Sequence, residues 1–121
     1  MLRHAALNQQ LSLEEKVALC SGADFFSTKA LPEHGIPAIA MADGPHGLRK
    51  QQAAADHLGL NQSVPATCFP TASLTACSWD RALLRELGVA LGEEALQEGV
   101  SIVLGPGANL KRNPLCGRNF E

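Results

Sequence analysis

The sequence predicts an α/β fold with a parallel sheet, and it predicts that the domain is incomplete. Two short apolar runs, residues 38–42 and 100–104, each follow a segment with helical signals. Strands separated by helices pair in parallel through right-handed crossovers. Two or three strands neither close a sheet nor cover both of its faces, so the 121 residues indicate part of a larger α/β unit.

The first predicted helix begins after Ser12. Residues 12–15 fit the S-x-x-E capping box, in which the Ser12 hydroxyl accepts from the Glu15 N–H and the Glu15 side chain bonds back. A short apolar face follows, made of Leu13, Val17, Ala18 and Leu19. Ser21-Gly22 ends the helix, and the next loop carries Phe25 and Phe26 as predicted anchors.

The middle of the chain predicts one strand, one loop and a second short strand. Residues 38–42 are apolar on both sides and stop at Asp43-Gly44-Pro45, which suits a strand buried on both faces of a parallel sheet. Residues 50–62 are rich in Gln, Ala and polar residues and predict an exposed loop with room for one helical turn. A short strand is predicted at residues 73–76.

The clearest helical pattern covers residues 80–98, where leucines recur at helical spacing. Ser78 is the predicted N-cap, and Asp80 falls in the first turn, where the helix dipole favours an acid. Gly99 is the predicted C′ residue, after which residues 100–104 form the next buried strand. Three acids of this helix are interpreted as surface charges: Glu93, Glu94 and Glu98.

Composition excludes several classes of protein. A hydrophobic content of 45% and a charged content of 18% are typical of a globular domain rather than a disordered one. The net charge of −2 and scattered basic residues do not form a nucleic-acid-binding stripe. No apolar run is long enough to span a membrane. The four cysteines form no C-x-x-C pair, so we expect no metal site and, without an apolar leader, a cytoplasmic protein with reduced thiols.

Two polar clusters follow the two predicted strands. The first is residues 43–49, and the second holds Asn109, Lys111, Arg112 and Arg118. In a (β/α)8 barrel the active site forms at this end of the strands. The Asp43 carboxylate suits two sugar hydroxyls, and a neighbouring glycine allows close approach. Asp-Gly also caps turns, and from these residues alone the turn is the favoured interpretation of Asp43.

The basic residues have the same two interpretations. Arg118 offers five donors in a fixed fork to a hydroxyl-rich ring, but an arginine more often forms a structural ion pair. Lys111 and Arg112 also fit solvated loop charges. His46 is interpreted as a packed or hydrogen-bonded loop residue rather than a base. Residues 105–109 match neither phosphate-loop pattern, which leaves a phosphate-binding protein as a remote alternative.

Five stretches of the sequence together resemble the start of family 3 glycoside hydrolases. They are residues 11–17, 43–49, 69–71, 78–80 and 104–121, they occur in the family's order, and they cover nearly the whole chain. The resemblance implies a TIM-like (β/α)8 barrel, of which residues 1–121 are an incomplete N-terminal portion, followed by an α/β sandwich. It also implies a retaining exo-glycosidase that removes terminal β-D-glucosyl or related residues and needs no cofactor.

The resemblance assigns binding residues and no catalytic ones in this segment. Asp43 matches the aspartate that holds glucose hydroxyls in subsite −1, and Arg118 matches an arginine of the same pocket; Lys111 and Arg49 are further substrate-binding candidates. The family's nucleophile, in a Ser-Asp-Trp motif, and its acid/base glutamate lie downstream. Ser78-Trp79-Asp80 has a different order and is not assigned as the nucleophile.

We therefore expect a glycosidase as the full-length protein and an inactive chain by itself. The expected substrate is a β-linked oligosaccharide or an aryl or alkyl glucoside, and the expected partner is the missing C-terminal part of the same protein. The alternative is a non-catalytic product of a truncated gene, or a split-gene subunit that needs a partner chain.

Overall fold

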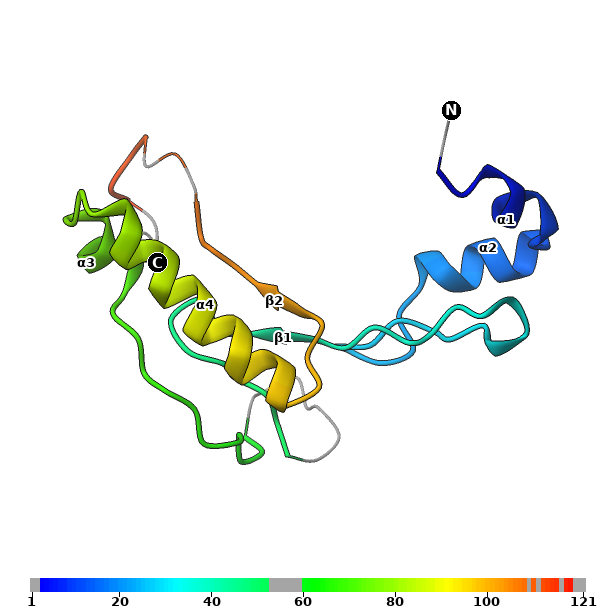
Figure 1. Cartoon of the computed structure of the whole chain (residues 1–121), viewed down its shortest axis with the longest axis horizontal. Coiled ribbons are helices and arrows are strands. Elements are labelled where there is room, and N and C mark those ends of the chain that lie inside the picture. The colour runs from blue at the N-terminus through cyan, green and yellow to red at the C-terminus, as the bar shows by residue number, and fades with distance from the viewer. Residues whose placement is uncertain (1–2, 53–59, 109, 111, 116, 119–121) are drawn as a thin grey trace.

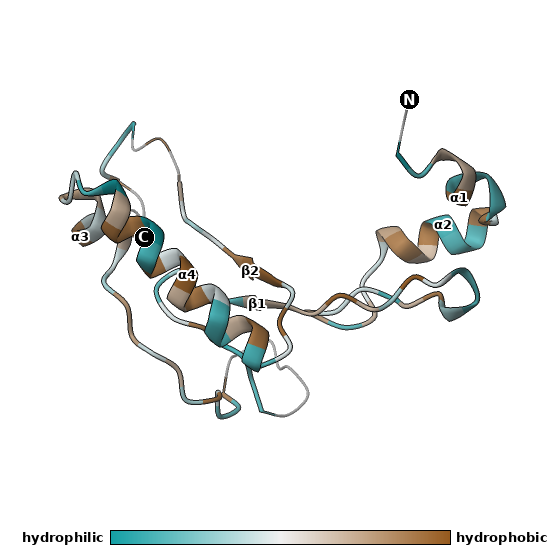
Figure 2. Cartoon of the chain, viewed as in Figure 1, coloured by the Kyte–Doolittle hydropathy of each residue, from teal (hydrophilic) through white to brown (hydrophobic). Residues whose placement is uncertain are grey.

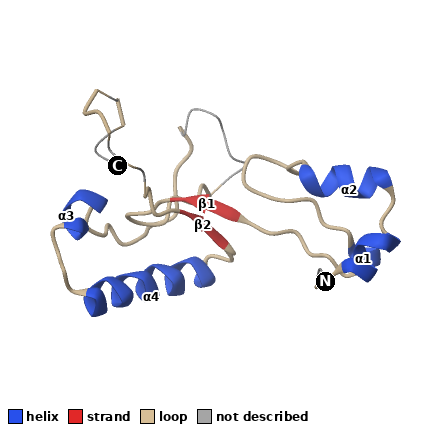
Figure 3. Cartoon of the chain, turned by 90° about the horizontal axis from the view of Figure 1, so that it is seen from above, coloured by secondary structure: helices blue, strands red, loops and turns tan. Residues whose placement is uncertain are grey.

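The computed structural model describes residues 3–52, 60–108, 110, 112–115 and 117–118 (Figure 1). Its elements are α1 (Ala5–Gln10), α2 (Leu13–Cys20), the 3-10 helix η1 (Pro32–His34), β1 (Met41–Asp43), α3 (Ala72–Ala76), α4 (Arg81–Gln97) and β2 (Ile102–Leu104). The chain is elongated, with α1 and α2 at one end and α3, α4 and the strands towards the other (Figures 1 and 3).

The capping box predicted at the start of α2 is confirmed. The Ser12 N–H donates to Glu15 Oε2 over 2.7 Å, and the Glu15 N–H donates to Ser12 Oγ over 3.2 Å. The backbone hydrogen bond from Ser12 lowers the pKa of the Glu15 carboxyl, and contact with His34 adds to that effect against opposing desolvation. Because His34 Nε2 lies 2.9 Å from Glu15 Oε1, this carboxylate also joins α2 to η1.

The helix α1 was not predicted from the sequence. It has only six residues, its N-cap His4 makes no side-chain cap hydrogen bond, and none of its residues is buried. A helix this short, without a cap and without a buried apolar face, carries no sequence signal that separates it from a loop.

An irregular hairpin connects α2 to β1. The Thr28 N–H donates to the Ile39 carbonyl over 3.0 Å, and the Met41 N–H donates to the Phe26 carbonyl over 2.7 Å. Phe26 is half-buried, but Phe25 is 51% exposed, so the prediction of a buried anchor is wrong for Phe25. Its ring borders a cavity that the described residues do not fill.

The strands β1 and β2 pair in parallel, as predicted, with Ala42 opposite Val103 and Asp43 opposite Leu104. Each strand is shorter than the predicted run. The prediction of a buried strand is wrong for β2, because Ile102 and Leu104 are 44% and 46% exposed, whereas Ala42 of β1 is buried. The helix α4 packs against β2, but this apolar strand, brown in Figure 2, keeps two of its three side chains exposed.

The prediction of a strand at residues 73–76 is wrong, because these residues lie in α3. Thr71 is extended and precedes the helix, and its carbonyl accepts from Thr75 Oγ1 over 3.2 Å. Cys77 Sγ donates to the Ser73 carbonyl over 3.3 Å. These short polar side chains bond back to the helical backbone, which offsets the β-propensity on which the prediction depended.

The helix α4 agrees with the predicted range to within one residue at each end, but its N-cap differs from the prediction. Asp80 is the cap, and its Oδ1 accepts from the N–H groups of Ala82 and Leu83 over 3.0 and 3.1 Å. The hydroxyl of Ser78, the predicted cap, accepts from the Asp80 N–H over 3.1 Å. Ser78 therefore positions the capping aspartate instead of capping the helix.

The C-terminal end of α4 confirms the predicted role of Gly99, whose φ of 67° is left-handed. The Val100 N–H donates to the Ala95 carbonyl over 2.8 Å, and the Gly99 N–H donates to the Leu96 carbonyl over 3.1 Å. This pair of bonds is a Schellman motif, and its apolar partners Ala95 and Val100 are both buried. The motif turns the chain from α4 directly into β2.

The core is small. Ala42, Leu48, Ala95 and Val100 form the buried cluster, and Val64 and Val103 pack against it. The surface of 9416 Å² greatly exceeds the value of about 6,300 Å² expected for a compact monomer of 12.8 kDa. An apolar groove of 540 Å³ also stays open between α3 and α4, with Leu74, Leu83 and Leu87 in its walls.

Backbone hydrogen bonds join the two ends of the loop formed by residues 50–64. The Val64 N–H donates to the Lys50 carbonyl over 2.8 Å, and the Gln52 N–H donates to the Gln62 carbonyl over 2.9 Å. Within residues 50–62 the sequence predicts an exposed loop with room for one helical turn. Most of this range, residues 53–59, lies outside the described residues.

We predict that the isolated 121-residue chain lacks a cooperative thermal transition, because its core is small and its strands keep exposed apolar residues. Circular dichroism should show a gradual loss of signal on heating, and a dye specific for apolar surface should bind at low temperature. A single sharp unfolding transition of the isolated chain would contradict this prediction.

Candidate functional site

The two polar clusters predicted from the sequence begin at the same edge of the sheet. Asp43 is the last residue of β1, and the register places it beside Leu104, the last residue of β2. The turn 44–49 and the segment that starts at Gly105 therefore leave the sheet side by side. This is the edge at which parallel α/β sheets bind ligands.

The turn after Asp43 depends on two glycines. Gly44 and Gly47 have φ angles of 115° and 149°. The Gly47 N–H donates to the Gly44 carbonyl over 3.2 Å, and the Arg49 N–H returns to the Asp43 carbonyl over 2.9 Å. A Cβ on Gly44 would lie 2.7 Å from the carbonyl carbon of Gly47, so no larger residue fits this turn as it stands.

A neighbouring segment supports the turn from outside. The Phe69 N–H donates to the His46 carbonyl over 2.7 Å. Thr67 lies against Gly47 so closely that a Cβ there would approach its carbonyl carbon to 3.4 Å. The turn 44–49 and residues 67–69 therefore form one packed unit.

Glu94 of α4 and its C-cap residue Glu98 hold this unit. The prediction of a surface charge is wrong for Glu94, whereas the Glu98 side chain is 36% exposed, as a surface charge would be. The carboxylate of half-buried Glu94 accepts from the Thr67 N–H over 3.2 and 3.3 Å. Lys50 Nζ donates to the Glu98 carbonyl over 2.5 Å and lies 3.5 Å from Glu98 Oε2. The sequence signal that could have indicated this role is the position of Glu94 next to Ala95, which is buried.

The turn and the second cluster enclose a cavity of 660 Å³. The cavity brings together Asp43, Arg49 and Arg118, three of the four predicted binding residues. The fourth, Lys111, lies outside the described residues. His46, Thr71 and the backbone of residues 105–107 complete the polar lining.

The chemistry of this lining suits a neutral polyol. A carboxylate accepts hydrogen bonds from adjacent hydroxyls, and guanidinium groups donate to the oxygens of the same hydroxyls. Asp43 is the one carboxylate among the described lining residues. Retaining hydrolysis needs two carboxyl groups about 5–5.5 Å apart, of which the described residues of this wall contribute one.

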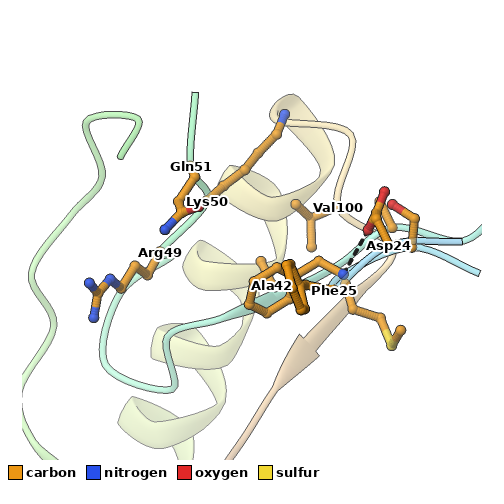
Figure 4. Close-up of a pocket in the computed structure, with 11 residues that line it drawn as sticks. Asp24, Phe25, Ala42, Arg49, Lys50, Gln51 and Val100 are labelled. Carbon is orange, nitrogen blue, oxygen red and sulfur yellow. Dashed lines mark hydrogen bonds between the residues drawn. The ribbon is translucent and has the colours of Figure 1, made fainter. Parts of the chain in front are cut away.

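A second cavity, of 270 Å³, shares Arg49 with the first (Figure 4). Figure 4 shows the Phe25 ring beside Ala42, with Arg49, Lys50 and Gln51 on one side of it and Asp24 on the other. Its charged groups have partners within the chain, since Asp24 Oδ1 accepts from the Phe26 N–H over 2.8 Å and Lys50 binds Glu98.

The described residues hold no group of three or more His, Cys, Asp or Glu side chains that could bind a metal ion. Cys20, Cys68 and Cys77 are exposed free thiols, and Cys116 lies outside the described residues. Within the same part of the chain, no helix has the length and apolar character needed to cross a membrane.

Known proteins similar to this chain are glycosidases, although no family model matches it. A thermostable beta-glucosidase B of Acetivibrio thermocellus is 63% identical over 113 residues, which cover 93% of this chain and 15% of that protein. An exo-alpha-(1->6)-L-arabinopyranosidase of Bifidobacterium longum is 49% identical over 114 residues, with the same shares covered.

Solved structures agree with the sequence relatives. The crystal structure of a GH3 beta-glucosidase from Bifidobacterium adolescentis matches with a TM-score of 0.76 and 46% identity, over 91% of this chain and 15% of that one. The chain therefore spans about 15% of the length of the relatives it matches, and it resembles them along nearly all of its own length.

We predict that Gly44→Ala destabilises the folded protein that contains this segment by about 1–3 kcal/mol, because alanine disfavours the backbone of this turn and its Cβ would meet Gly47. The control is Gly88→Ala in α4, where a Cβ meets nothing within 4 Å and stability should rise by about 0.5–1 kcal/mol. Chemical unfolding measures both. Equal effects of the two changes would show that the turn differs from the one described.

Proposed function

Because the chain matches a family 3 glycoside hydrolase along 91% of its length, we propose that it is the N-terminal portion of the TIM-like (β/α)8 barrel of a retaining, exo-acting β-glucosidase. The parallel pairing of β1 and β2 and the uncovered apolar face of β2 support this, because a barrel supplies further strands and helices. The remainder of the protein would cover these surfaces.

The cavity beside Asp43 is the observation that carries the proposal. We assign Asp43 to the hydroxyls of the terminal sugar, with Arg118 as a donor on the same wall and Arg49 at its side. Lys111 stays a further candidate. These contacts would orient the sugar so that binding energy is realised at the reacting carbon.

The chemistry itself needs residues beyond this segment. In a retaining mechanism one carboxylate attacks the anomeric carbon and forms a glycosyl-enzyme, while a carboxylic acid protonates the leaving oxygen. The same group then acts as a base on the water that releases the sugar. We place both carboxyl groups in the part of the protein that follows residue 121. A cytoplasmic location stays a prediction.

The substrate class is a terminal β-D-glucoside, as a β-linked oligosaccharide or an aryl or alkyl glucoside. The 63% identity to a beta-glucosidase favours it over the pentoside of the arabinopyranosidase relative, at 49% identity. Parallel assays on aryl β-D-glucoside and aryl α-L-arabinopyranoside with the full-length protein distinguish the two.

We predict that Asp43→Asn in the full-length protein lowers kcat/KM for an aryl β-D-glucoside at least 100-fold. Two hydrogen bonds to a charged acceptor contribute about 1.5–3 kcal/mol each, and about 1.4 kcal/mol is tenfold in rate. Steady-state kinetics measures the effect, and Asp24→Asn in the second cavity is the matched control. Wild-type kinetics for Asp43→Asn would refute the assignment of Asp43.

We predict that the reading frame of the source gene continues past codon 121 and encodes a Ser-Asp-Trp motif and a second domain. Sequencing the gene tests this directly. A stop codon after Glu121 would instead favour the alternative, a truncated product or a split-gene subunit that lacks both catalytic carboxyl groups.

A further inference from the structure

Glu94 of α4 contacts the wall of the cavity beside Asp43 through a series of intermediate residues. Both oxygens of the Glu94 carboxylate accept from the Thr67 N–H, over 3.2 and 3.3 Å, and Oε1 also accepts from the Thr67 hydroxyl. Hydrogen bonds to an ionised acceptor are stronger than neutral ones. Glu94 therefore fixes both donors of one residue.

From Thr67 the contacts lead into the turn beside Asp43. Thr67 packs on Gly47 where no Cβ would fit, and two residues later the Phe69 N–H binds the His46 carbonyl over 2.7 Å. Thr71, two residues further on, lines the cavity itself. Displacing Thr67 would therefore move both the turn and the part of the wall that Thr71 forms.

A second contact, from the C-cap residue of the same helix, lies at the other end of the turn. Glu98 lies one helical turn after Glu94, and its carbonyl accepts from Lys50, the residue next to Arg49. Between these two contacts, Leu48 is 4% exposed and packs in the same buried cluster as Ala95 of α4. The helix α4 and its C-cap therefore contact the turn 44–49 through Leu48 and hold the residues that flank it, Thr67 and Lys50.

We propose that Glu94 is a positioning residue for sugar binding: its carboxylate holds residues 67–71 against the turn 44–49 and so sets the shape of the cavity beside Asp43. This rests on the function proposed above. Glu94 does not line the cavity and makes no contact with the sugar in this arrangement.

The test uses the full-length protein and compares Glu94→Ala with Glu93→Ala, which removes the same charge from an exposed position on the same helix turn. Assays run at a temperature at which circular dichroism shows each variant fully folded. Glu94→Ala should lower kcat/KM for an aryl β-D-glucoside about 10- to 100-fold and weaken glucose binding by a similar factor. Glu93→Ala should leave both unchanged.

The threonine provides a gentler pair of variants, which decides the question if Glu94→Ala does not fold. Thr67→Ser keeps both donors and should behave as wild type, whereas Thr67→Val removes the hydroxyl and should weaken glucose binding several-fold. Because Glu94 and Thr67 act together, the effects of Glu94→Ala and Thr67→Val should not add in the double variant.

Two results would overturn the inference, and they differ from failure of the proposed function. If Glu94→Ala, or Thr67→Val where Glu94→Ala does not fold, lowers only the melting temperature and leaves kcat/KM and glucose affinity within twofold of wild type, the residue has a structural role alone. If the effects of Glu94→Ala and Thr67→Val add fully, they do not act through one contact. Measuring Asp43→Asn in parallel separates these cases, because only wild-type kinetics of that variant would refute the sugar site itself.

Discussion

The parallel register of β1 and β2 is the constraint on which the site depends. It places Asp43 beside Leu104, so that two segments more than fifty residues apart in the chain leave the sheet at one edge. The Schellman motif at the end of α4 makes this register possible, because Val100 enters the core immediately after Gly99. The same register pairs Ala42 with Val103, so the buried cluster lies at the middle of the two strands.

Glycine, charge and close packing act together around Asp43. Gly44 and Gly47 let the chain reverse within a few residues and let Thr67 approach. The glycines provide no side chains to pack the turn, so Glu94 and Glu98, at the end of α4, hold the residues beside it, Thr67 and Lys50. A turn built from residues with so little volume of their own depends on its neighbours for rigidity, which explains why a helix outside the cavity bears on its shape.

Local signals in the sequence predicted those elements whose cause is local. The capping box of α2, the leucine pattern of α4, Gly99 and the parallel pairing are confirmed. The strand at residues 73–76 and the cap at Ser78 were wrong, because each depended on a choice between alternative hydrogen bonds that only the folded backbone decides. The roles of Glu94 and Glu98 depend on residues 27 and 48 positions away, which no periodicity reports. Asp43, Arg49 and Arg118 line one cavity, and their roles in sugar binding stay a prediction.

The hydrogen-bonded base of the loop after Lys50 has a consequence for how such a chain tolerates change. The backbone leaves and re-enters through paired residues, with Gln52 bonded to Gln62 and Lys50 to Val64. The entropic cost of closing a loop rises only slowly with its length, so residues added between these ends need not disturb the turn or α4. The segment is therefore a natural place for insertions, where a longer loop or a whole inserted module can be accommodated a few residues from the cavity beside Asp43.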